Sequence, residues 1–133
     1  MKVLKGSCLC GETEFAVQDN FQYAGYCHCS RCRKASGGNG LAIGGIPREN
    51  FNVTQGMQNI KHYSRSESST ACFCSHCGSS LYSEKLETGL IHIRYSSLDD
   101  IPSLLPQAHI FVSSKADWYE ITDELPQFQE FPQ

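Results

Sequence analysis

The 133-residue chain lacks a long hydrophobic run, because its longest, Leu90–Ile93, is interrupted by His92. A membrane-spanning helix needs about 20 consecutive apolar residues, so no transmembrane segment is expected. The first residues, MKVLKGSCLCG, also lack the apolar stretch and cleavage pattern of a secretion signal. The sequence therefore predicts a cytoplasmic protein with no membrane partner.

Basic residues are too few and too scattered to form a stripe. Lys and Arg number 11 against 14 Asp and Glu, which gives a net charge of −3. Binding to phosphate backbones needs a concentrated basic surface. We therefore expect no nucleic-acid partner.

Long amphipathic helices, internal repeats and linkers are absent too, and short β-rich runs recur instead. Gly, Pro, Asn, Asp and Ser punctuate these runs every eight to twelve residues or so. The pattern predicts one domain, residues 1–133, with a mostly β fold of small antiparallel sheets and only short helical turns. The expected strands are Thr13–Val17, Gln22–Tyr26, Leu41–Ile43, Phe51–Thr54, Ile60–Tyr63, Thr70–Phe73, Ser80–Ser83, Leu90–Tyr95, Ala108–Val112 and Trp118–Ile121.

The best helix candidate is SRCRKASG, which would begin at a possible N-cap, Ser30, and stop near Gly37 and Gly38. Trp118, the single tryptophan, is expected in the core. The tail ELPQFQEFPQ is either extended and docked through Phe128 and Phe131, or loose.

Eight cysteines fall into three closely spaced groups, CLC, CHCSRC and CFCSHC. Cys-x-Cys and Cys-x-x-Cys pairs join distant segments poorly by disulfides, but they chelate metal well. With no secretion signal and a chain of this length, metal binding is favoured over a disulfide framework.

The cleanest division joins Cys8 and Cys10 to Cys74 and Cys77 in a closed structural zinc site. Each pair is followed directly by a glycine, which lets the backbone turn tightly around a metal. Such a site would clip together segments about sixty residues apart, so metal binding would contribute to folding.

Cys27, Cys29 and Cys32 remain, with Cys72 spare. In one interpretation, Cys72 completes a second closed site. In the favoured one, three thiolates hold a zinc whose fourth position is open to substrate. Residues two apart on a strand share a face. We therefore expect Cys72 to lie near the quartet that contains Cys74, and not near Cys27, Cys29 and Cys32.

The histidines are weaker candidates for ligands. We expect His28 and His76 to be exposed or bonded to backbone, and His62 and His92 to be surface or satisfied core residues. His109, which precedes an apolar strand, is a candidate for a pocket or supporting role.

Together, GSCLCGETEF, YCHCSRCRKASG, FCSHCGSSLY, SSLDD and HIFVSSKADWYEI resemble the glutathione-dependent formaldehyde-activating (Gfa-like) family, over about Gly6 to Pro126. The resemblance implies a tent-like β fold with two zinc ions. It implies structural ligands at Cys8, Cys10, Cys74 and Cys77, and a labile catalytic zinc at Cys27, Cys29 and Cys32.

The activity implied by the resemblance is a carbon–sulfur lyase reaction that forms or cleaves S-(hydroxymethyl)glutathione. Glutathione is then the expected small-molecule thiol partner. Arg31, Arg33 and Lys34 flank the catalytic cysteines and are candidates for attracting its carboxylates, against a role as solvated surface charge. Two other functions stay open: a non-catalytic zinc-stabilised binding module, which a second site closed by Cys72 would favour, and a thiol or metal sensor.

Overall fold

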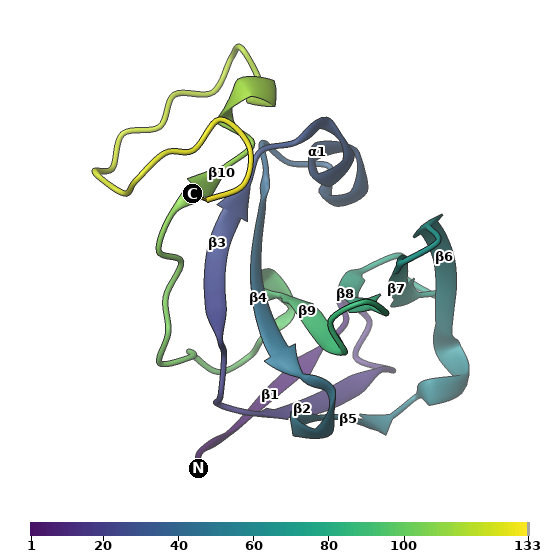
Figure 1. The fold of residues 1–133 in the computed structure, drawn as a ribbon. Helices are drawn as coiled ribbons and strands as arrows, with labels where there is room; N and C mark the ends of the chain where they lie inside the picture. Colours follow the sequence, from purple (N-terminus) through teal and green to yellow (C-terminus); the bar gives the residue numbers. More distant parts are fainter. Residues whose placement is uncertain (133) are drawn as a thin grey trace.

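The computed structural model describes residues 1–132, and its architecture is mostly β, as expected (Figure 1). One sheet has three strands in the order β1-β2-β5, and the other has seven in the order β10-β3-β4-β9-β8-β7-β6. The strands are β1 (Val3–Ser7), β2 (Glu14–Gln18), β3 (Tyr23–Cys27), β4 (Leu41–Pro47), β5 (Phe51–Gln55), β6 (Ile60–Ser66), β7 (Ser69–Cys74), β8 (Ser80–Lys85), β9 (Leu90–Arg94) and β10 (His109–Ile110).

Helical structure is short, as the sequence indicates. The α-helix α1 (Ser30–Ser36) ends at Gly37, whose left-handed backbone (φ 70°) closes its last turn. Its N-cap is Cys29 rather than the expected Ser30, because the Cys29 sulfur accepts a hydrogen bond from the Cys32 amide. Single 3-10 turns cover Arg48–Asn50, Met57–Asn59, Tyr95–Ser97 and Val112–Ser114.

The strand pairings are antiparallel except that β10 runs parallel to β3. In Figure 1, β3 and β4 stand on one side of the molecule and β6 to β8 on the other, with α1 above them. The seven-stranded sheet is therefore larger than the small sheets expected. No helix in residues 1–132 has the length and apolar character needed to cross a membrane.

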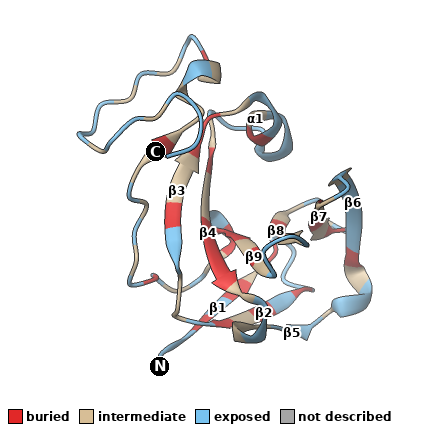
Figure 2. Ribbon diagram, viewed as in Figure 1, coloured by how far each residue is buried: buried red, intermediate tan, exposed pale blue. Residues whose placement is uncertain are grey.

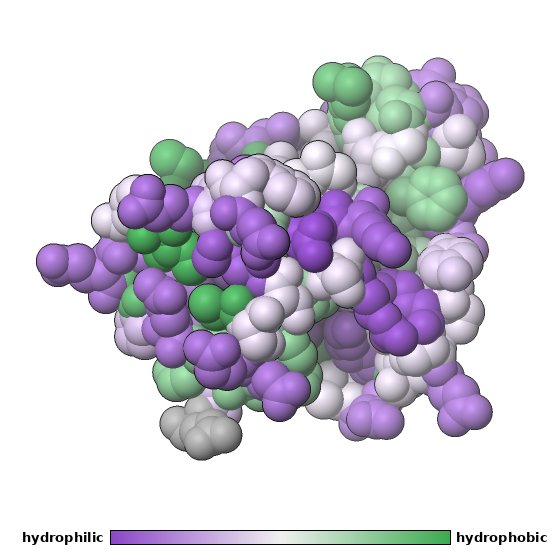
Figure 3. All heavy atoms as spheres, turned by 90° about the horizontal axis from the view of Figure 1, so that it is seen from above, coloured by the Kyte–Doolittle hydropathy of each residue, from purple (hydrophilic) through white to green (hydrophobic). Residues whose placement is uncertain are grey.

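The core lies between the two sheets. Buried residues are concentrated on β4 and on the strands near it in Figure 2. On the face seen in Figure 3, hydrophobic residues form separate groups among hydrophilic ones. The fully buried core includes Leu4, Phe15, Ile46, Leu81, Ile91 and Ile93.

Two strand predictions differ from the structure. β1 was not expected, because Lys5 and Gly6 weaken the apolar alternation of VLKGS. Gly6 nevertheless faces inward, where the Phe15 ring takes the space of a side chain. The predicted strand Trp118–Ile121 does not form. Trp118 is 74% exposed rather than in the core, and its indole N–H donates to Asn39 Oδ1 at 2.8 Å.

The C-terminal tail is docked, which is the first of its two expected conformations. The Phe128 amide donates to the His109 carbonyl at 2.9 Å, and the Val112 amide donates to the Phe128 carbonyl at 3.1 Å. Phe131 packs edge-on against Phe111, with ring centroids 4.8 Å apart. The tail therefore extends the structure beside β10.

Candidate functional site

Four cysteines from two distant segments meet where the turn after β1 faces the turn after β7. The sulfur-ligand atoms of Cys8, Cys10, Cys74 and Cys77 all lie within 4.8 Å of one another. Cys8 and Cys10 are 3.5 Å apart at sulfur, and Cys10 and Cys74 are 3.8 Å apart. Tetrahedral zinc with Zn–S bonds of about 2.3 Å places its sulfurs about 3.8 Å apart, so this quartet fits a closed zinc site.

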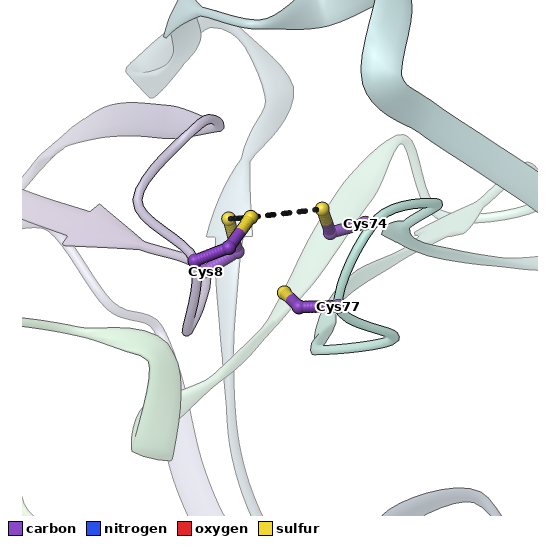
Figure 4. Close-up of side chains that lie close together, drawn as sticks. Cys8, Cys74 and Cys77 are labelled. Carbon is purple, nitrogen blue, oxygen red and sulfur yellow. Dashed lines mark hydrogen bonds between the residues drawn. The ribbon is translucent and has the colours of Figure 1, made fainter.

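Local backbone geometry directs these thiols inward. Figure 4 shows the sulfurs of Cys8, Cys74 and Cys77 pointing toward one another. Gly11 and Gly78, which follow the two pairs, both have φ of 78°, a conformation that favours glycine. The amide of Gly78 donates to the Cys74 carbonyl at 2.8 Å, which closes the second turn.

A second group of thiols lies where β3 runs into α1. The sulfurs of Cys27, Cys29 and Cys32 also lie within 4.8 Å of one another. Hydrogen bonding with the Cys27 thiol, aided by Cys29 and by Arg65, lowers the pKa of Cys32 to about 5. The same interaction with Cys32 raises the pKa of Cys27. One of the three thiols is therefore deprotonated at neutral pH, and such a site readily accepts a cation.

These three cysteines line a cavity of about 470 Å³ together with three basic residues, which form its basic wall. Arg65 comes from β6, Lys85 from β8 and Arg94 from β9. Among residues 1–132, no carboxylate forms an ion pair with any of these three cations. The cavity therefore presents three sulfur ligands and three positive charges that lack carboxylate partners.

Arg94 is the most constrained of the cations, since only 1% of it is exposed. Its guanidinium donates to Ser83 Oγ at 2.7 Å and to Ser80 Oγ at 3.1 Å. Burial lowers its pKa to about 10, so it stays protonated at neutral pH. Burying an unpaired charge is costly, and an anion in the cavity would offset that cost.

Comparison with known proteins adds evidence independent of this geometry. The family model described as "Glutathione-dependent formaldehyde-activating enzyme" matches residues 3–114. The chain belongs to this family. A curated relative from Halomonas elongata, named "Putative glutathione-dependent formaldehyde-activating enzyme", is 32% identical over 127 residues, covering 90% of this chain and 81% of the relative.

A crystal structure of a Rhodobacter sphaeroides protein has a similar fold. Its TM-score is 0.62 at 22% identity, and the match covers 74% of this chain and 91% of that one. The likeness supports the mostly β architecture of this family member. The quartet and the three-cysteine group both lie inside the segment matched by the family model.

Cys72 joins neither group of thiols in this family member. It is fully buried on β7, and its sulfur lies 3.8 Å from Glu84 Oε1. His62 completes a third group of possible metal ligands with these two residues. Burial, reinforced by Glu84, raises the pKa of Cys72 to about 12. Cys72 is thus a protonated core thiol. It packs in the same buried cluster as Cys8 and Cys74 and not in the cluster of Cys27 and Cys32, so the expectation that it lies near the quartet is confirmed.

His28 belongs to no group of possible metal ligands among residues 1–132, as expected, but the prediction that it is exposed is wrong. His28 is buried, with 3% exposed, and its Nε2 lies 2.7 Å from His109 Nδ1. His109 Nε2 lies 3.0 Å from both carboxylate oxygens of Asp123. The His28 amide also donates to the Ile110 carbonyl at 3.0 Å. This chain of contacts fixes the residue between Cys27 and Cys29, so it orients the thiol loop from behind.

His109 and His28 also line a separate cavity of about 320 Å³, together with Tyr26, Tyr119 and Asp123. This location agrees with the pocket role considered for His109. By contrast, His76 is half exposed, as expected, and pairs with Glu12.

The basic residues proposed from sequence are only partly placed at the site. Arg31 lines the thiol cavity. Arg33 instead lies over the exposed Trp118 ring, 5.9 Å from its centroid, and Lys34 is not among the lining residues. Sequence reasoning missed Arg65, Lys85 and Arg94. In the sequence, these three residues stood out only as basic residues near the ends of expected strands. That position does not reveal which cavity their side chains enter.

His92 lies at the wall of the thiol cavity and was not expected there. Its Nε2 hydrogen-bonds the Tyr23 hydroxyl. Burial, together with Lys85, Arg94 and Arg65, lowers the pKa of His92 to about 4. His92 is therefore a neutral imidazole at pH 7, beside three cations.

Proposed function

We propose that this protein is a zinc-dependent carbon–sulfur lyase that forms or cleaves the adduct of glutathione with an aldehyde. The observation that carries the proposal is the cavity in which Cys27, Cys29 and Cys32 face Arg65, Lys85 and Arg94. Family membership supports glutathione-dependent formaldehyde activation as the general activity. The lyase reaction, the zinc ions and the role of each residue are parts of the proposal.

Cys8, Cys10, Cys74 and Cys77 would hold a structural zinc, because four thiols at tetrahedral spacing leave no place for substrate. Cys27, Cys29 and Cys32 would hold a second zinc. When bound there, zinc would leave one coordination position for the sulfur of a thiol and would lower the pKa of that thiol. Cys72, which could have closed this second site, instead lies against Glu84.

The basic wall would bind and orient the substrate. Zinc with three thiolates carries a net negative charge of about one, which Arg65, Lys85 and Arg94 more than balance. The remaining positive charge suits a thiol with carboxylate groups, such as glutathione. Arginine binds carboxylates by paired N–H donors, so Arg65, which is less constrained than Arg94, is the best candidate for direct contact.

The reaction itself needs one proton transfer. In the cleavage direction, the adduct hydroxyl loses its proton, a C=O bond forms, and the C–S bond breaks with its electron pair leaving on sulfur. In the opposite direction the thiolate attacks the aldehyde carbon, and the new alkoxide takes up the proton. His92 lies at the wall of the thiol cavity, and its hydrogen bond to the Tyr23 hydroxyl makes the pair a neutral proton donor and acceptor at pH 7.

The test is the rate of exchange between glutathione plus formaldehyde and their adduct, measured by NMR with and without protein. We expect Arg65→Gln to raise KM about tenfold, the size of one lost hydrogen bond to a charged group. Arg48→Gln is the matched control, since Arg48 pairs with Glu84 outside the cavity. Exchange no faster than without protein, or equal KM in both variants, would refute the proposal.

A further inference from the structure

A second cavity continues from the thiol cavity along the same face of β3 and β4. It has a volume of about 550 Å³. Tyr23 and Gly25 line it from β3, and Ile43 and Gly45 line it from β4. We call it the apolar cavity, because aliphatic and aromatic side chains and glycines form most of its wall.

Strand geometry shows that the two cavities are consecutive. Side chains two residues apart on a strand share a face, so Cys27 in the thiol cavity and Gly25 in the apolar cavity face the same way. Two residues of strand span about 7 Å. Ile43, His92, Ile110 and Phe131 line both cavities, so the boundary between the two is shared.

The apolar cavity owes its walls to particular residues. A Cβ at Gly25 would lie 3.2 Å from the Ala108 carbonyl oxygen, a tight contact, so glycine at this position lets the backbone of Ala108 approach β3 closely and form one wall. The docked C-terminal tail contributes Pro126, Phe128 and Phe131 to the wall. Its backbone bonds to His109 and Val112 hold that wall in place.

Formaldehyde carries no hydrocarbon substituent, so its adduct with glutathione would leave the apolar cavity without a ligand. We propose that this cavity binds a hydrocarbon chain on the adduct carbon, so that the substrates include adducts of thiols with apolar aldehydes of several carbons. This inference rests on the proposed function, because the sulfur of the adduct must lie at Cys27, Cys29 and Cys32. The hydrocarbon chain then extends along β3 and β4, away from the basic wall.

The test compares two stable thioether analogues on the full zinc-loaded chain by calorimetry. S-methylglutathione probes the glutathione site alone, and S-hexylglutathione adds a chain long enough to enter the apolar cavity. Each buried methylene strengthens binding by up to about fourfold, so we expect the hexyl analogue to bind at least about tenfold more tightly than the methyl one.

Variants locate the gain. Ala108→Leu fills the apolar cavity and should abolish the advantage of the hexyl analogue without changing affinity for the methyl analogue. Ala71→Leu, on β7 and outside both cavities, is the matched control and should keep the advantage. If Ala108→Leu fails to fold, Phe128→Ala takes its place. It removes part of the tail wall and should reduce the advantage of the hexyl analogue.

The outcomes separate the two proposals. If both analogues bind the wild-type chain equally, this inference is wrong and the proposed glutathione site stands. An advantage that persists in the folded Ala108→Leu variant also overturns it. If neither analogue binds, the glutathione site and the inference built on it are both wrong.

Discussion

Replacing His92 by glutamine should make the protein less sensitive to acid. His92 has a pKa of about 4 in the folded chain against an ordinary value of 6.5, mainly because it is buried and also because Lys85, Arg94 and Arg65 repel its charged form. The unfolded chain therefore binds a proton at His92 between about pH 6.5 and 4, while the folded chain does not. The contribution of His92 to the free energy of unfolding is therefore fully present above this pH window and is lost as the pH falls through it.

The size of the effect follows from the two pKa values. Each unit of difference corresponds to about 1.4 kcal/mol, so full protonation of the unfolded chain would cost about 3 kcal/mol. At pH 5 only part of that difference is realised, and the expected loss is about 2 kcal/mol relative to pH 7. The loss disappears in His92→Gln, because glutamine does not titrate.

Urea unfolding of both proteins at pH 7 and pH 5, under reducing conditions with zinc present, measures this difference. Proton competition at the cysteines affects both proteins alike and cancels in the comparison. Tyr23→Phe is the control, because it removes the hydroxyl partner of His92 but keeps its burial and its cationic neighbours. If wild type and His92→Gln lose equal stability between the two pH values, His92 is not held neutral in the folded protein.

Three further predictions address the thiol sites and the core. Cys29→Ser should lower the zinc content by one ion per chain and leave the fold intact by circular dichroism. Cys74→Ser should lower the zinc content and also abolish cooperative thermal unfolding. Equal damage from the two substitutions would refute the division into open and closed sites. Asp123→Asn should weaken zinc retention against a chelator about tenfold, since it removes the anchor of the buried histidines behind the thiol loop, and retention equal to wild type would contradict that role. Gly6→Ala should destabilise the fold by about 2 kcal/mol in urea, because its methyl group would lie 2.1 Å from the Phe15 ring, and an unchanged midpoint would show that the ring moves aside without cost.

The sequence was sufficient to group the cysteines because their signal is local. Closely spaced thiols followed by glycine predict a chelating turn without knowledge of the rest of the fold. The structure places Cys8 and Cys10 beside Cys74 and Cys77, and keeps Cys27, Cys29 and Cys32 together. Helix α1 was predictable for the same reason, because Gly37 is a local signal for the end of a helix.

The basic wall was not predictable because it depends on register. Arg65, Lys85 and Arg94 are scattered along the sequence, and the net charge of −3 conceals them. Their convergence follows from the pairing of β6 with β7, β7 with β8 and β8 with β9, which the sequence alone does not fix. A shift of one residue in any of these pairings would turn a cation to the other face.

The error at His28 has the same origin. Alternation within CHC correctly indicates that His28 points away from Cys27 and Cys29, and an outward direction was taken to mean solvent. Instead, β10 pairs in parallel with β3 and brings His109 behind that loop. Alternation gives the direction of a side chain, but only the topology determines what it meets.

The two thiol sites differ in what the surrounding structure supplies, and this difference supports their separate roles. The quartet supplies all four ligands of a tetrahedral metal site, with the four sulfurs contributed by two turns. The open group has three sulfurs, a supporting histidine chain behind it and cations in front of it. Arg65, Lys85 and Arg94 carry more positive charge than a zinc held by three thiolates needs for balance, and burying Arg94 without a carboxylate partner opposes folding. Such a surplus of buried positive charge suits an anionic ligand, which is why the proposed substrate site rests on the cation wall more than on the thiols themselves.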